Sequence, residues 1–552
     1  MLTGVRKGTG IGHTFGYNRH AELVEARLPL GAGFKWEYAT LDYPQGSVRG
    51  ITGRGITLSP AEPEAVYRIE RARRGSRPAR ETCTILNEPD GRARRIWLFS
   101  SDPQLQDYGL LSVLEERDGR SNAILRRTSY RWKYTVAGVP YVGSVSTALD
   151  PHTRNEKVSR TETDCDLFGN IVETRQYDYD NPATPMKITR NTYLDDDEYL
   201  AGGILNRLVS TTMSDGIESV ELLRNQYDTT PLIDRKRTAE HDGIRFGVSR
   251  TARGNLTESI AGGVYRRFHR DITGSVCMVE DSSGVRTEIV STAGTGSGGE
   301  TTFIPNGNND LSIRAFRDIS SRLSAVLLPN GVRITVERDR SGRPTALMSA
   351  EGARYDIACD GGAAIVSLNG RYRKITADDF GRLRFIEEGD ETGAVSIIEY
   401  RYGPVANAPS GKCVRASLPH ASGASAEWVS LEYDALGRAT AYDFAGHGGS
   451  RRFAYAGNAV TIYHVDGGWK KLIHDAAGNL RNVTTPDPDG GPDQETVYRY
   501  TPNGKVSGVS MLRPDGVQTR TFTYDAGGRA VVRNHVERGP ERRSYNSDGT
   551  LA

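Results

Sequence analysis

Two adjacent residues, His474 and Asp475, come nearest to a catalytic pair in this 552-residue chain. A histidine base oriented by a carboxylate needs a nucleophile beside it. The chain has no Gly-x-Ser-x-Gly motif and no cysteine within a catalytic signature. The two residues also fill the first positions of a turn that recurs along the chain. The sequence therefore favours a structural role for them, and it predicts no catalytic residue and no enzymatic activity.

Side chains with oxygen atoms that could bind calcium gather at three places: the acidic run 195–198 (DDDE), the stretch 487–495 (DPDGGPDQE), and Asn306 with Asn308 and Asp310. The second place does not fit a calcium loop, because Pro492 stands where glycine is required. Asn-Gly-Asn is typical of a turn, and a short acidic run is typical of a solvated loop. We expect no metal at any of the three.

Two Gly-x-Gly stretches, GTGIG (8–12) and GTGSGG (294–299), could hold phosphate. Neither lies between an apolar strand and a helix, and neither continues into Gly-Lys-Ser/Thr, so both are interpreted as flexible loops and no cofactor is predicted. An arginine cluster could also bind phosphate. Acidic residues lie among its members, which favours a solvated or salt-bridged strand face. The arginines are Arg68, Arg71, Arg73, Arg74, Arg77, Arg80, Arg92, Arg94 and Arg95, and the acids are Glu62, Glu64, Glu70 and Glu81.

Charge and composition exclude further classes of protein. The 71 basic and 69 acidic residues nearly cancel, so no general attraction to nucleic acid is expected. No run of 18 apolar residues could span a membrane, and the N-terminus has no apolar signal core. The five cysteines lie far apart, which argues against a zinc site and a dense disulfide framework. Because only 37% of the residues are apolar, a thick core is not expected.

Glycines recur at intervals of 8 to 13 residues in the second half of the chain. Turn signals at this spacing are typical of an all-β protein. One series is Gly331, Gly342, Gly352, Gly362, Gly370 and Gly381; the other is Gly437, Gly448, Gly457, Gly468, Gly478, Gly491, Gly504, Gly516, Gly528, Gly539 and Gly549.

Alternate turns carry a longer motif, which is Tyr-Asp-x-x-Gly-Arg in its complete form. It reads YDALGR (433–438), HDAAGN (474–479), YTPNGK (500–505), YDAGGR (524–529) and YNSDGT (545–550), with weaker copies upstream, among them RDISSR (317–322). The Asp can accept hydrogen bonds from backbone amides two residues on, and Gly supplies the positive φ that closes a bulged hairpin. The predicted turn residues are Tyr433, Asp434, Gly437, Arg438, Asp475, Gly478, Tyr500, Gly504, Tyr524, Asp525, Gly528, Arg529, Tyr545 and Gly549.

The strands between these turns alternate in polarity, as Arg382, Leu383, Arg384 and Phe385 do. A period of two predicts an antiparallel sheet with little helix. The repeat of about twenty residues is too short for a four-stranded propeller blade, and tight reversing turns disfavour a parallel β-helix. We divide the chain into an N-terminal β region that could begin a shell (1–150), degenerate repeats (151–300) and a regular array (301–552), within one continuous β-body. The stretch STAGTGSGGE (291–300) is the best candidate for a linker or exposed loop.

At these turns the chain resembles the Rhs/YD-repeat family, which includes bacterial Rhs polymorphic toxins, the B and C components of Tc toxins, and the teneurins. The turns cover most of residues 150–552, and Asn206-Arg207-Leu208 stands where the family often has Gly-Arg-Leu. The resemblance implies a YD-repeat antiparallel β-ribbon that spirals into a hollow shell or part of one. The chain ends at YNSDGTLA, inside a repeat, and lacks the family's closing core segment, so no cleavage residue is carried over.

The resemblance further implies a function, which is the wall of a shell that encloses or displays a C-terminal toxin domain absent from this chain. The implied partners are that toxin or cargo domain, or a second shell chain, with no nucleic acid. The implied location is outside the cell or at its surface, as part of a larger protein. An extracellular adhesion or carbohydrate-binding module is the alternative, and a self-cleaving protein is the third possibility.

Overall fold

The computed structural model describes residues 3–6, 12–43, 46–59, 64–73, 81–100, 102, 104–179, 181–234, 241–294, 298–403, 411–444, 449–513, 516–546 and 549–552. The chain forms two compact units, and each collects stretches that are distant in the sequence. Unit 1 contains Met1–Trp132, Val145–Val158 and Tyr355–Lys471, and unit 2 contains Lys133–Ser144, Ser159–Arg354 and Leu472–Ala552. The predicted division at 150 and 300 stays a prediction.

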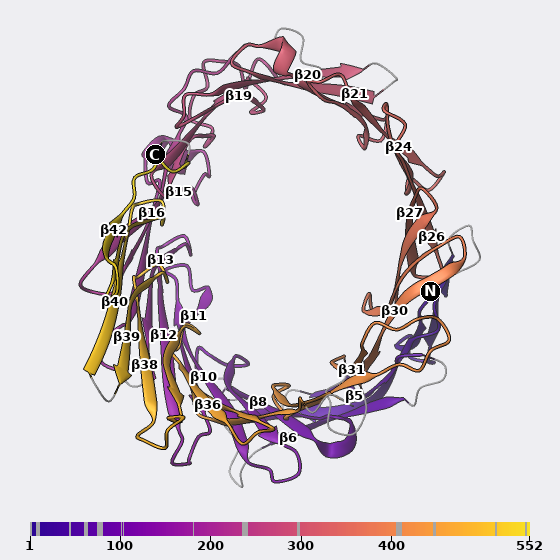
Figure 1. The fold of residues 1–552 in the computed structure, drawn as a ribbon, viewed down its shortest axis with the longest axis vertical. Helices are drawn as coiled ribbons and strands as arrows, with labels where there is room; N and C mark the ends of the chain where they lie inside the picture. The colour runs from indigo at the N-terminus through magenta and orange to yellow at the C-terminus, as the bar shows by residue number, and fades with distance from the viewer. Residues whose placement is uncertain are drawn as a thin grey trace. The chain divides into compact units, whose positions relative to one another are not determined.

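Unit 1 is built from β-strands that follow one another closely along the chain (Figure 1). They are β1 (Gly4–Arg6), β2 (Gly12–Tyr17), β3 (Leu23–Arg27), β4 (Gly33–Tyr43), β5 (Gly46–Thr57), β6 (Ala65–Arg73), β7 (Glu81–Asn87), β8 (Ala93–Ser100), β9 (Leu111–Asp118), β27 (Ala363–Leu368), β28 (Arg371–Ala377), β29 (Leu383–Asp390), β30 (Gly393–Tyr402), β31 (Cys413–Ser417), β32 (Trp428–Tyr433), β33 (Ala439–Phe444), β34 (Arg451–Ala456) and β35 (Ala459–His464). A single turn of 3-10 helix, η1 (Pro89–Gly91), precedes β8.

Unit 2 has the same construction. Its strands are β13 (Ile171–Tyr177), β14 (Lys187–Tyr193), β15 (Leu208–Ser214), β16 (Ser219–Tyr227), β17 (Leu256–Ala261), β18 (Val264–Arg270), β19 (Val276–Asp281), β20 (Arg286–Gly294), β21 (Gly298–Pro305), β22 (Ile313–Arg317), β23 (Leu323–Leu327), β24 (Arg333–Arg338), β25 (Pro344–Ser349), β37 (Leu480–Thr485), β38 (Gln494–Tyr500), β39 (Val506–Arg513), β40 (Gly516–Tyr524), β41 (Ala530–His535) and β42 (Gly539–Arg542). It also contains the short helices α1 (Asp197–Ala201) and η2 (Asn309–Leu311). The chain passes between the units within β10 (Ile124–Tyr134), β11 (Pro140–Leu149), β12 (Lys157–Cys165), β26 (Arg354–Asp360) and β36 (Trp469–His474).

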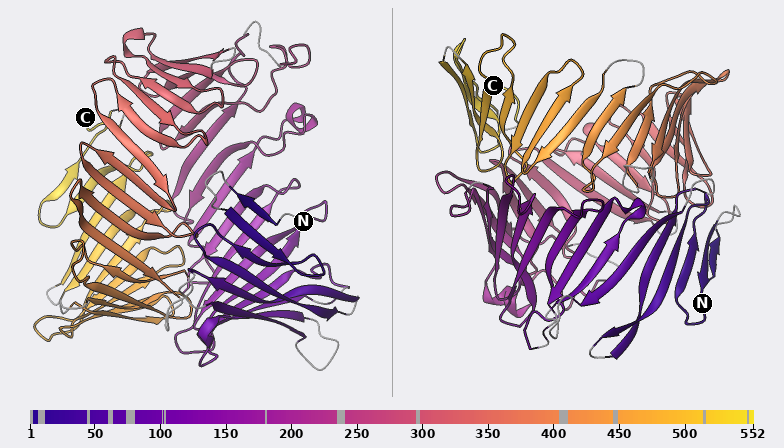
Figure 2. Two further views of the ribbon diagram at one scale, coloured as in Figure 1. Left: turned by 90° about the vertical axis from the view of Figure 1, so that its right-hand side faces the viewer. Right: turned by 90° about the horizontal axis from the view of Figure 1, so that it is seen from below.

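Strands that are adjacent in the sequence are also neighbours in the sheet, and they run antiparallel. β4 pairs with β5 from Gly33 opposite Thr57 to Tyr43 opposite Gly46, and β38 pairs with β39 in the same way. Figure 2 shows this succession of hairpins along the ribbon. Each residue of such a ladder needs a partner only in the next or the previous strand, so the fold is built from local contacts. The all-β fold predicted from the turn spacing and the antiparallel sheet predicted from the strand alternation are confirmed.

Both faces of this sheet are largely exposed to solvent. The accessible surface is 32143 Å², whereas a compact protein of this mass exposes about 19,500 Å². Among the described residues, the largest side chains that are less than 2% exposed belong to Thr257 and Asp271, which are both polar. A small apolar cluster of Cys83, Ile85, Ile96 and Leu98 lies on β7 and β8. Hydrogen bonds along the ladder therefore carry a larger share of the structure than apolar packing does.

Two details of the turn series are corrected. The left-handed backbone at two turns is taken by Gly467 (φ +85°) and Gly490 (φ +78°), one residue before the predicted Gly468 and Gly491. The predicted Gly448 lies outside the described residues. At the copy with Ser in place of Gly, Ser321 adopts φ +60°, so the turn keeps its shape at a conformational cost.

The stretch 291–300, predicted as a linker or exposed loop, belongs largely to the paired strands of a hairpin. β20 and β21 pair through Ser291 opposite Thr301 as far as Gly294 opposite Gly298. Glycine and serine can occupy strands when neighbours supply the ladder, so composition alone misled the prediction here.

Candidate functional site

The repeat turns were predicted as the structural site, and the turn at 433–438 illustrates their geometry. Asp434 Oδ1 accepts hydrogen bonds from the backbone amides of Leu436 and Arg438, both at 2.9 Å. Gly437 has φ +75°, and its amide donates to the Asp434 carbonyl at 3.0 Å. The strand register shifts between Glu432 and Tyr433, which is a bulge. The turn thus closes the hairpin while it satisfies its own backbone groups.

The other predicted turns repeat this geometry. Asp475 accepts from the amides of Ala477 (3.0 Å) and Asn479 (2.8 Å), and Asp525 accepts from the amide of Arg529 (2.9 Å). Thr501 replaces the aspartate in one copy, where its hydroxyl accepts from the Lys505 amide at 3.1 Å. The glycines of these turns all lie in the left-handed region: Gly478 (φ +85°), Gly504 (φ +80°), Gly528 (φ +71°) and Gly549 (φ +88°).

Arginine at the end of the motif joins one turn to the next strand pair. Arg438 Nε donates to Asp434 Oδ2 at 2.6 Å, and its guanidinium lies 4.1 Å from the ring centroid of Tyr455. The Tyr455 hydroxyl then donates to the carbonyl of Ala439 at 2.8 Å. We call this arrangement the Asp–Arg–Tyr interlock. It ties the start of one hairpin to the end of the next through a charge pair, a stacked ring and a hydrogen bond.

The interlock recurs in both units. In unit 1, Arg382 pairs with Asp378 and covers Tyr402 at 4.5 Å. In unit 2, Arg529 pairs with Asp525 and covers Tyr545 at 4.9 Å. Hydroxyl-to-carbonyl bonds of the same kind are made by Tyr402 to Leu383, Tyr433 to Cys413, Tyr500 to Leu480, Tyr524 to Val506 and Tyr545 to Ala530. Each of the four predicted tyrosines thus bonds to a backbone carbonyl of a neighbouring strand.

Burial and hydrogen bonding shift the pKa values of several of these groups. Burial raises the pKa of Tyr433, Tyr455 and Tyr500, so each phenol remains a proton donor at neutral pH. Burial alone would also raise the pKa of Asp525. The hydrogen bonds from the Arg529 amide and guanidinium outweigh it, and the pKa lies below its ordinary value.

Within each unit, turns of the late stretch are hydrogen-bonded to the early stretch. In unit 1, Asp379 accepts from the amides of Leu30 and Ala32, both at 2.8 Å, while Phe380 meets Phe34 edge-on at 5.6 Å between ring centroids. These contacts join the turn between β3 and β4 to the turn between β28 and β29 through side chains rather than through a ladder.

Three further contacts extend this seam, which we define as the set of turn-to-turn hydrogen bonds between early and late stretches. Arg92 Nη1 donates to the Asp434 carbonyl at 2.9 Å. The Gly457 amide donates to Asp150 at 2.6 Å, and in unit 2 the Ala476 amide donates to Asp178 at 2.9 Å. The seam contacts were not predicted, because an aspartate that contacts a distant turn looks the same in sequence as one that serves its own turn.

Three of the predicted residues, Asp475, Tyr500 and Gly504, also line a polar cleft of about 600 Å³ in unit 2. Asp178, Lys187 and Arg481 contribute to the same cleft. The Asp475 side chain is 3% exposed, and it accepts three hydrogen bonds from its own turn, the third from the Asn479 side chain at 3.0 Å. Asp475 thus accepts hydrogen bonds from the backbone and side chain of its own turn, and the structural role of the pair with His474 stays a prediction.

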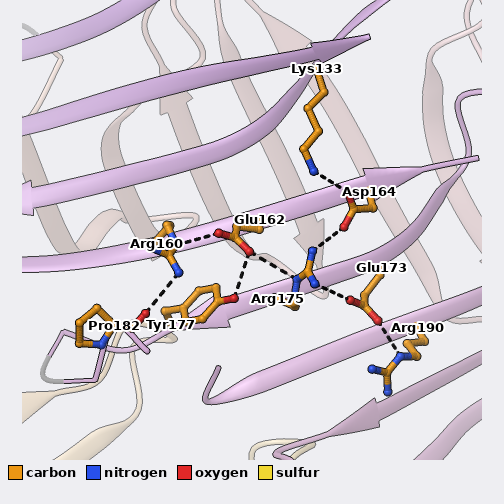
Figure 3. Close-up of polar contacts among 9 residues, drawn as sticks. All are labelled: Lys133, Arg160, Glu162, Asp164, Glu173, Arg175, Tyr177, Pro182 and Arg190. Carbon is orange, nitrogen blue, oxygen red and sulfur yellow. Dashed lines mark hydrogen bonds and ion pairs between the residues drawn. The ribbon is translucent and has the colours of Figure 1, made fainter. Parts of the chain in front are cut away.

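Charged side chains also bridge neighbouring strands across the sheet face (Figure 3). Arg175 on β13 contacts Glu162 (3.4 Å) and Asp164 on β12 as well as Glu173 (3.2 Å). Glu173 in turn pairs with Arg190 on β14 at 2.6 Å. Such cross-strand pairs stabilise a wet sheet face where apolar packing is absent. The network was not located from the sequence, because strand register was unknown.

In the arginine cluster, Arg68, Arg92 and Arg95 pair with carboxylates, whereas Arg71 forms no ion pair among the described residues. Arg95 pairs with Glu88 at 3.0 Å and with Glu116 at 3.6 Å, and Arg68 pairs with Glu37. Arg74, Arg77, Arg80 and Glu62 lie outside the described residues, as do the side chains of Arg73 and Glu81. The salt-bridged interpretation holds for the described pairs.

The candidate calcium ligands are occupied by local structure. Asp196 caps α1 by accepting from the Glu198 amide at 3.0 Å, so the acidic run opens a short helix instead of the predicted loop. Asn306 accepts from the Arg286 amide at 2.8 Å, and Asn308 accepts from the Asp310 amide at 2.9 Å. Within the described ranges no group of three or more His, Cys, Asp or Glu residues could hold a metal ion.

The two Gly-x-Gly stretches are described only in part. Residues 8–11 and 295–297 lie outside the described residues, and Gly298 and Gly299 belong to β21. The five cysteines are free thiols. No helix in the described part of the chain is long and apolar enough to cross a membrane.

Comparisons with known proteins give structural matches alone. Neither a scan against protein-family models nor a search of curated proteins finds a match. The chain is similar to a crystal structure of TcdB2-TccC3-Cdc42, with 13% identity and a TM-score of 0.43 over 98% of this chain and 28% of that chain. It is also similar to a Photorhabdus luminescens Tc holotoxin pore, with 11% identity and a TM-score of 0.38 over 97% of this chain and 30% of that chain.

A crystal structure of TcdB2-TccC3 matches with 10% identity and a TM-score of 0.33 over 99% of this chain and 38% of that chain. The chain therefore spans between 28% and 38% of the length of these chains.

Proposed function

We propose that the chain is a structural wall, a segment of an Rhs-type β-shell that encloses or displays a C-terminal toxin domain lying outside this chain. The observation that supports it most is the continuous ladder with two wet faces, because 32143 Å² of accessible surface is far more than a packed globule exposes. A sheet that does not fold onto a core leaves a face free for a compartment or a partner.

The repeat turns supply the rigidity that such a wall needs. Arg438 and Arg529 each bridge an aspartate and a tyrosine of successive hairpins, so the strands are fixed without a second layer. The seam then joins early and late stretches, as Asp379 does with Leu30 and Ala32. The predicted turn residues are thus proposed as the structural site of the wall, and the wall acts by exclusion rather than by bond chemistry.

The proposed partner is a toxin or cargo domain of a parent protein, or a second chain that completes the shell. The proposed setting is the outside of the cell or its surface. The chain's nearly balanced charge, with 71 basic and 69 acidic residues, suits a wall that contacts cargo without holding it by net charge.

Small-angle X-ray scattering of the purified chain tests the wall. A compact protein of 552 residues has a radius of gyration of about 24 Å. We expect a clearly larger radius and a pair-distance maximum displaced toward long distances, as for a body with an empty interior. A radius near the compact value would contradict the proposal.

Enclosure needs a separate test. An unstructured, protease-sensitive segment is fused after Ala552, and its cleavage rate is compared with that of the same segment on an unrelated carrier. We expect slower cleavage in the fusion with this chain. Equal cleavage rates would be compatible with a structural wall but would exclude enclosure of the segment by this chain alone.

A further inference from the structure

An aromatic cleft crosses five consecutive strands of unit 1. It has a volume of about 420 Å³, and every strand from β4 to β8 contributes to its lining. Trp36 lies at the β4 end, and Trp97 and Phe99 lie at the β8 end. Ile69 and Leu86, which are opposite each other in the ladder, form the apolar floor between them. Such a collection of large aromatic rings on a wet sheet favours a ligand with apolar side chains.

Two arginines line the same cleft without an acidic partner. In the described residues neither Arg54 nor Arg71 has an ion pair, although most arginines of the neighbouring strands have one. The Arg54 guanidinium lies 4.7 Å from the Tyr67 ring centroid. The Arg71 guanidinium passes close to Gly50, where a Cβ atom on residue 50 would meet it. Guanidinium groups held beside apolar rings bind carboxylates strongly and in a defined orientation.

The length of the cleft distinguishes a peptide from a single ring. Five neighbouring strands span four inter-strand spacings, or about 19 Å. An extended peptide of about six residues has this length, whereas an aromatic acid of one ring would fill one end and leave the other empty. Charge and shape together favour an extended segment that alternates aromatic and acidic side chains.

The geometry points to this cleft as a binding site for an extended acidic, aromatic peptide segment, whose carboxylates pair with Arg54 and Arg71 while its rings pack on Trp36 and Trp97. The site goes beyond the wall function and does not depend on it. A wall that enclosed nothing could still bind such a segment on this face.

Fluorescence anisotropy with the full-length chain measures the binding. The probe is a fluorescein-labelled hexapeptide of alternating Phe and Asp. Two comparison peptides replace Phe by Ser or Asp by Lys. We expect the Phe/Asp peptide to bind at least tenfold more tightly than either comparison peptide. Equal affinity of the Phe/Lys peptide would overturn the proposal, and so would an absence of measurable binding.

Variants then locate the site. Arg54→Gln with Arg71→Gln should weaken binding of the Phe/Asp peptide about tenfold, because both carboxylate partners are lost. The matched control is Arg415→Gln with Arg451→Gln, which removes the same charge from exposed strand positions outside the cleft. The control should bind like the parent chain. Equal weakening in both double variants would show a nonspecific charge effect and refute the site.

A third arm separates peptide from small molecule. Trp97→Phe keeps an apolar ring in place, so folding is preserved and is checked by circular dichroism, while the indole contact is removed. We expect weaker peptide binding in this variant. Free indole-3-acetate should compete poorly, at concentrations at least 100-fold above those of unlabelled peptide. If indole-3-acetate competed at the same concentrations as unlabelled peptide, the proposal of a peptide ligand would be overturned in favour of a small aromatic acid.

Discussion

The guanidinium of Arg438 lies 4.1 Å from the ring centroid of Tyr455, 17 residues further along the chain. The same guanidinium is held by Asp434, and the Tyr455 hydroxyl returns to the carbonyl of Ala439, next to Arg438. A closed set of contacts therefore spans one repeat. In a sheet with little apolar core, contacts of this kind decide local stability.

Arg438→Gln should open its hairpin locally. The change removes the ion pair with Asp434 and the stacking on Tyr455, and each is worth up to about 1 kcal/mol. Native-state hydrogen exchange should show faster exchange in 430–456 and unchanged exchange in unit 2. The exposed Arg451→Gln serves as the control, with near-normal exchange expected. Uniform acceleration over the whole chain would contradict a local role.

Tyr500→Phe should destabilise the chain, and Tyr498→Phe should not. The Tyr500 hydroxyl donates to the Leu480 carbonyl at 2.7 Å, whereas Tyr498, on the same strand, has no hydroxyl hydrogen bond among the described residues. The change removes one hydrogen bond from a part-buried site, at a cost of about 1 kcal/mol. Exchange rates of the β37–β38 amides measure the difference. Equal effects of the two changes would refute the hydroxyl's contribution.

Gly478→Ala and Gly508→Ala should change stability in opposite directions. Gly478 has φ +85° and open space around it, so alanine there meets only the backbone penalty of about 1 kcal/mol. Gly508 lies within strand β39, and a Cβ there would make ordinary contacts at 3.7 Å. Alanine at that site should stabilise by up to about 1 kcal/mol, because a strand glycine loses more chain entropy on folding. Urea unfolding followed by circular dichroism compares the two.

Acid should weaken the turns through their aspartates. Backbone amides and arginines lower the pKa of Asp339 below its ordinary value of 3.8, and the pKa of Asp525 is also lowered because its hydrogen bonds outweigh its burial. A carboxylate with a depressed folded-state pKa stabilises the fold above about pH 4, and this contribution is lost as pH falls through the folded-state value.

Urea midpoints measured from pH 7 to pH 3 should therefore stay nearly level and then fall below about pH 4. Asp525→Asn cannot titrate at that position, so its midpoint should be lower at pH 7 and should fall less steeply in acid. Tyr498→Phe is the control and should follow the parent curve. A parallel decline in Asp525→Asn would contradict the assigned role of this carboxylate.

Much of the fold could be predicted from local chemistry. Gly437, Gly504 and Gly528 mark turns because their positive φ is difficult for other residues, and the alternation after Gly381 gives the strand period. The turn positions failed by one residue at Gly467 and Gly490, where a second glycine stands beside each and the pattern cannot choose between them. The strands around Gly294 were missed because their small residues pair through neighbours rather than through propensity.

For the candidate site too, local contacts could be predicted from the sequence and long-range contacts could not. The Asp434 and Asp525 turns are local, so sequence spacing is enough to propose them. The contact between Asp379 and Leu30 joins residues far apart in the chain, and the aromatic cleft depends on the register of five strands. The Asp379–Leu30 contact and the cleft leave no periodic signal in the sequence, because both depend on which strands become neighbours after folding.

The Leu30–Asp379 hydrogen bond spans 349 residues, and this separation has a consequence for biosynthesis. Ladder pairs can form as soon as each hairpin leaves the ribosome, but the amide of Leu30 must wait for Asp379 to be translated. At ordinary elongation speeds that delay is roughly 20 to 70 seconds. During that interval the turn that contains Leu30 lacks its partner. It is then most exposed to chaperones and to mispairing with another growing chain.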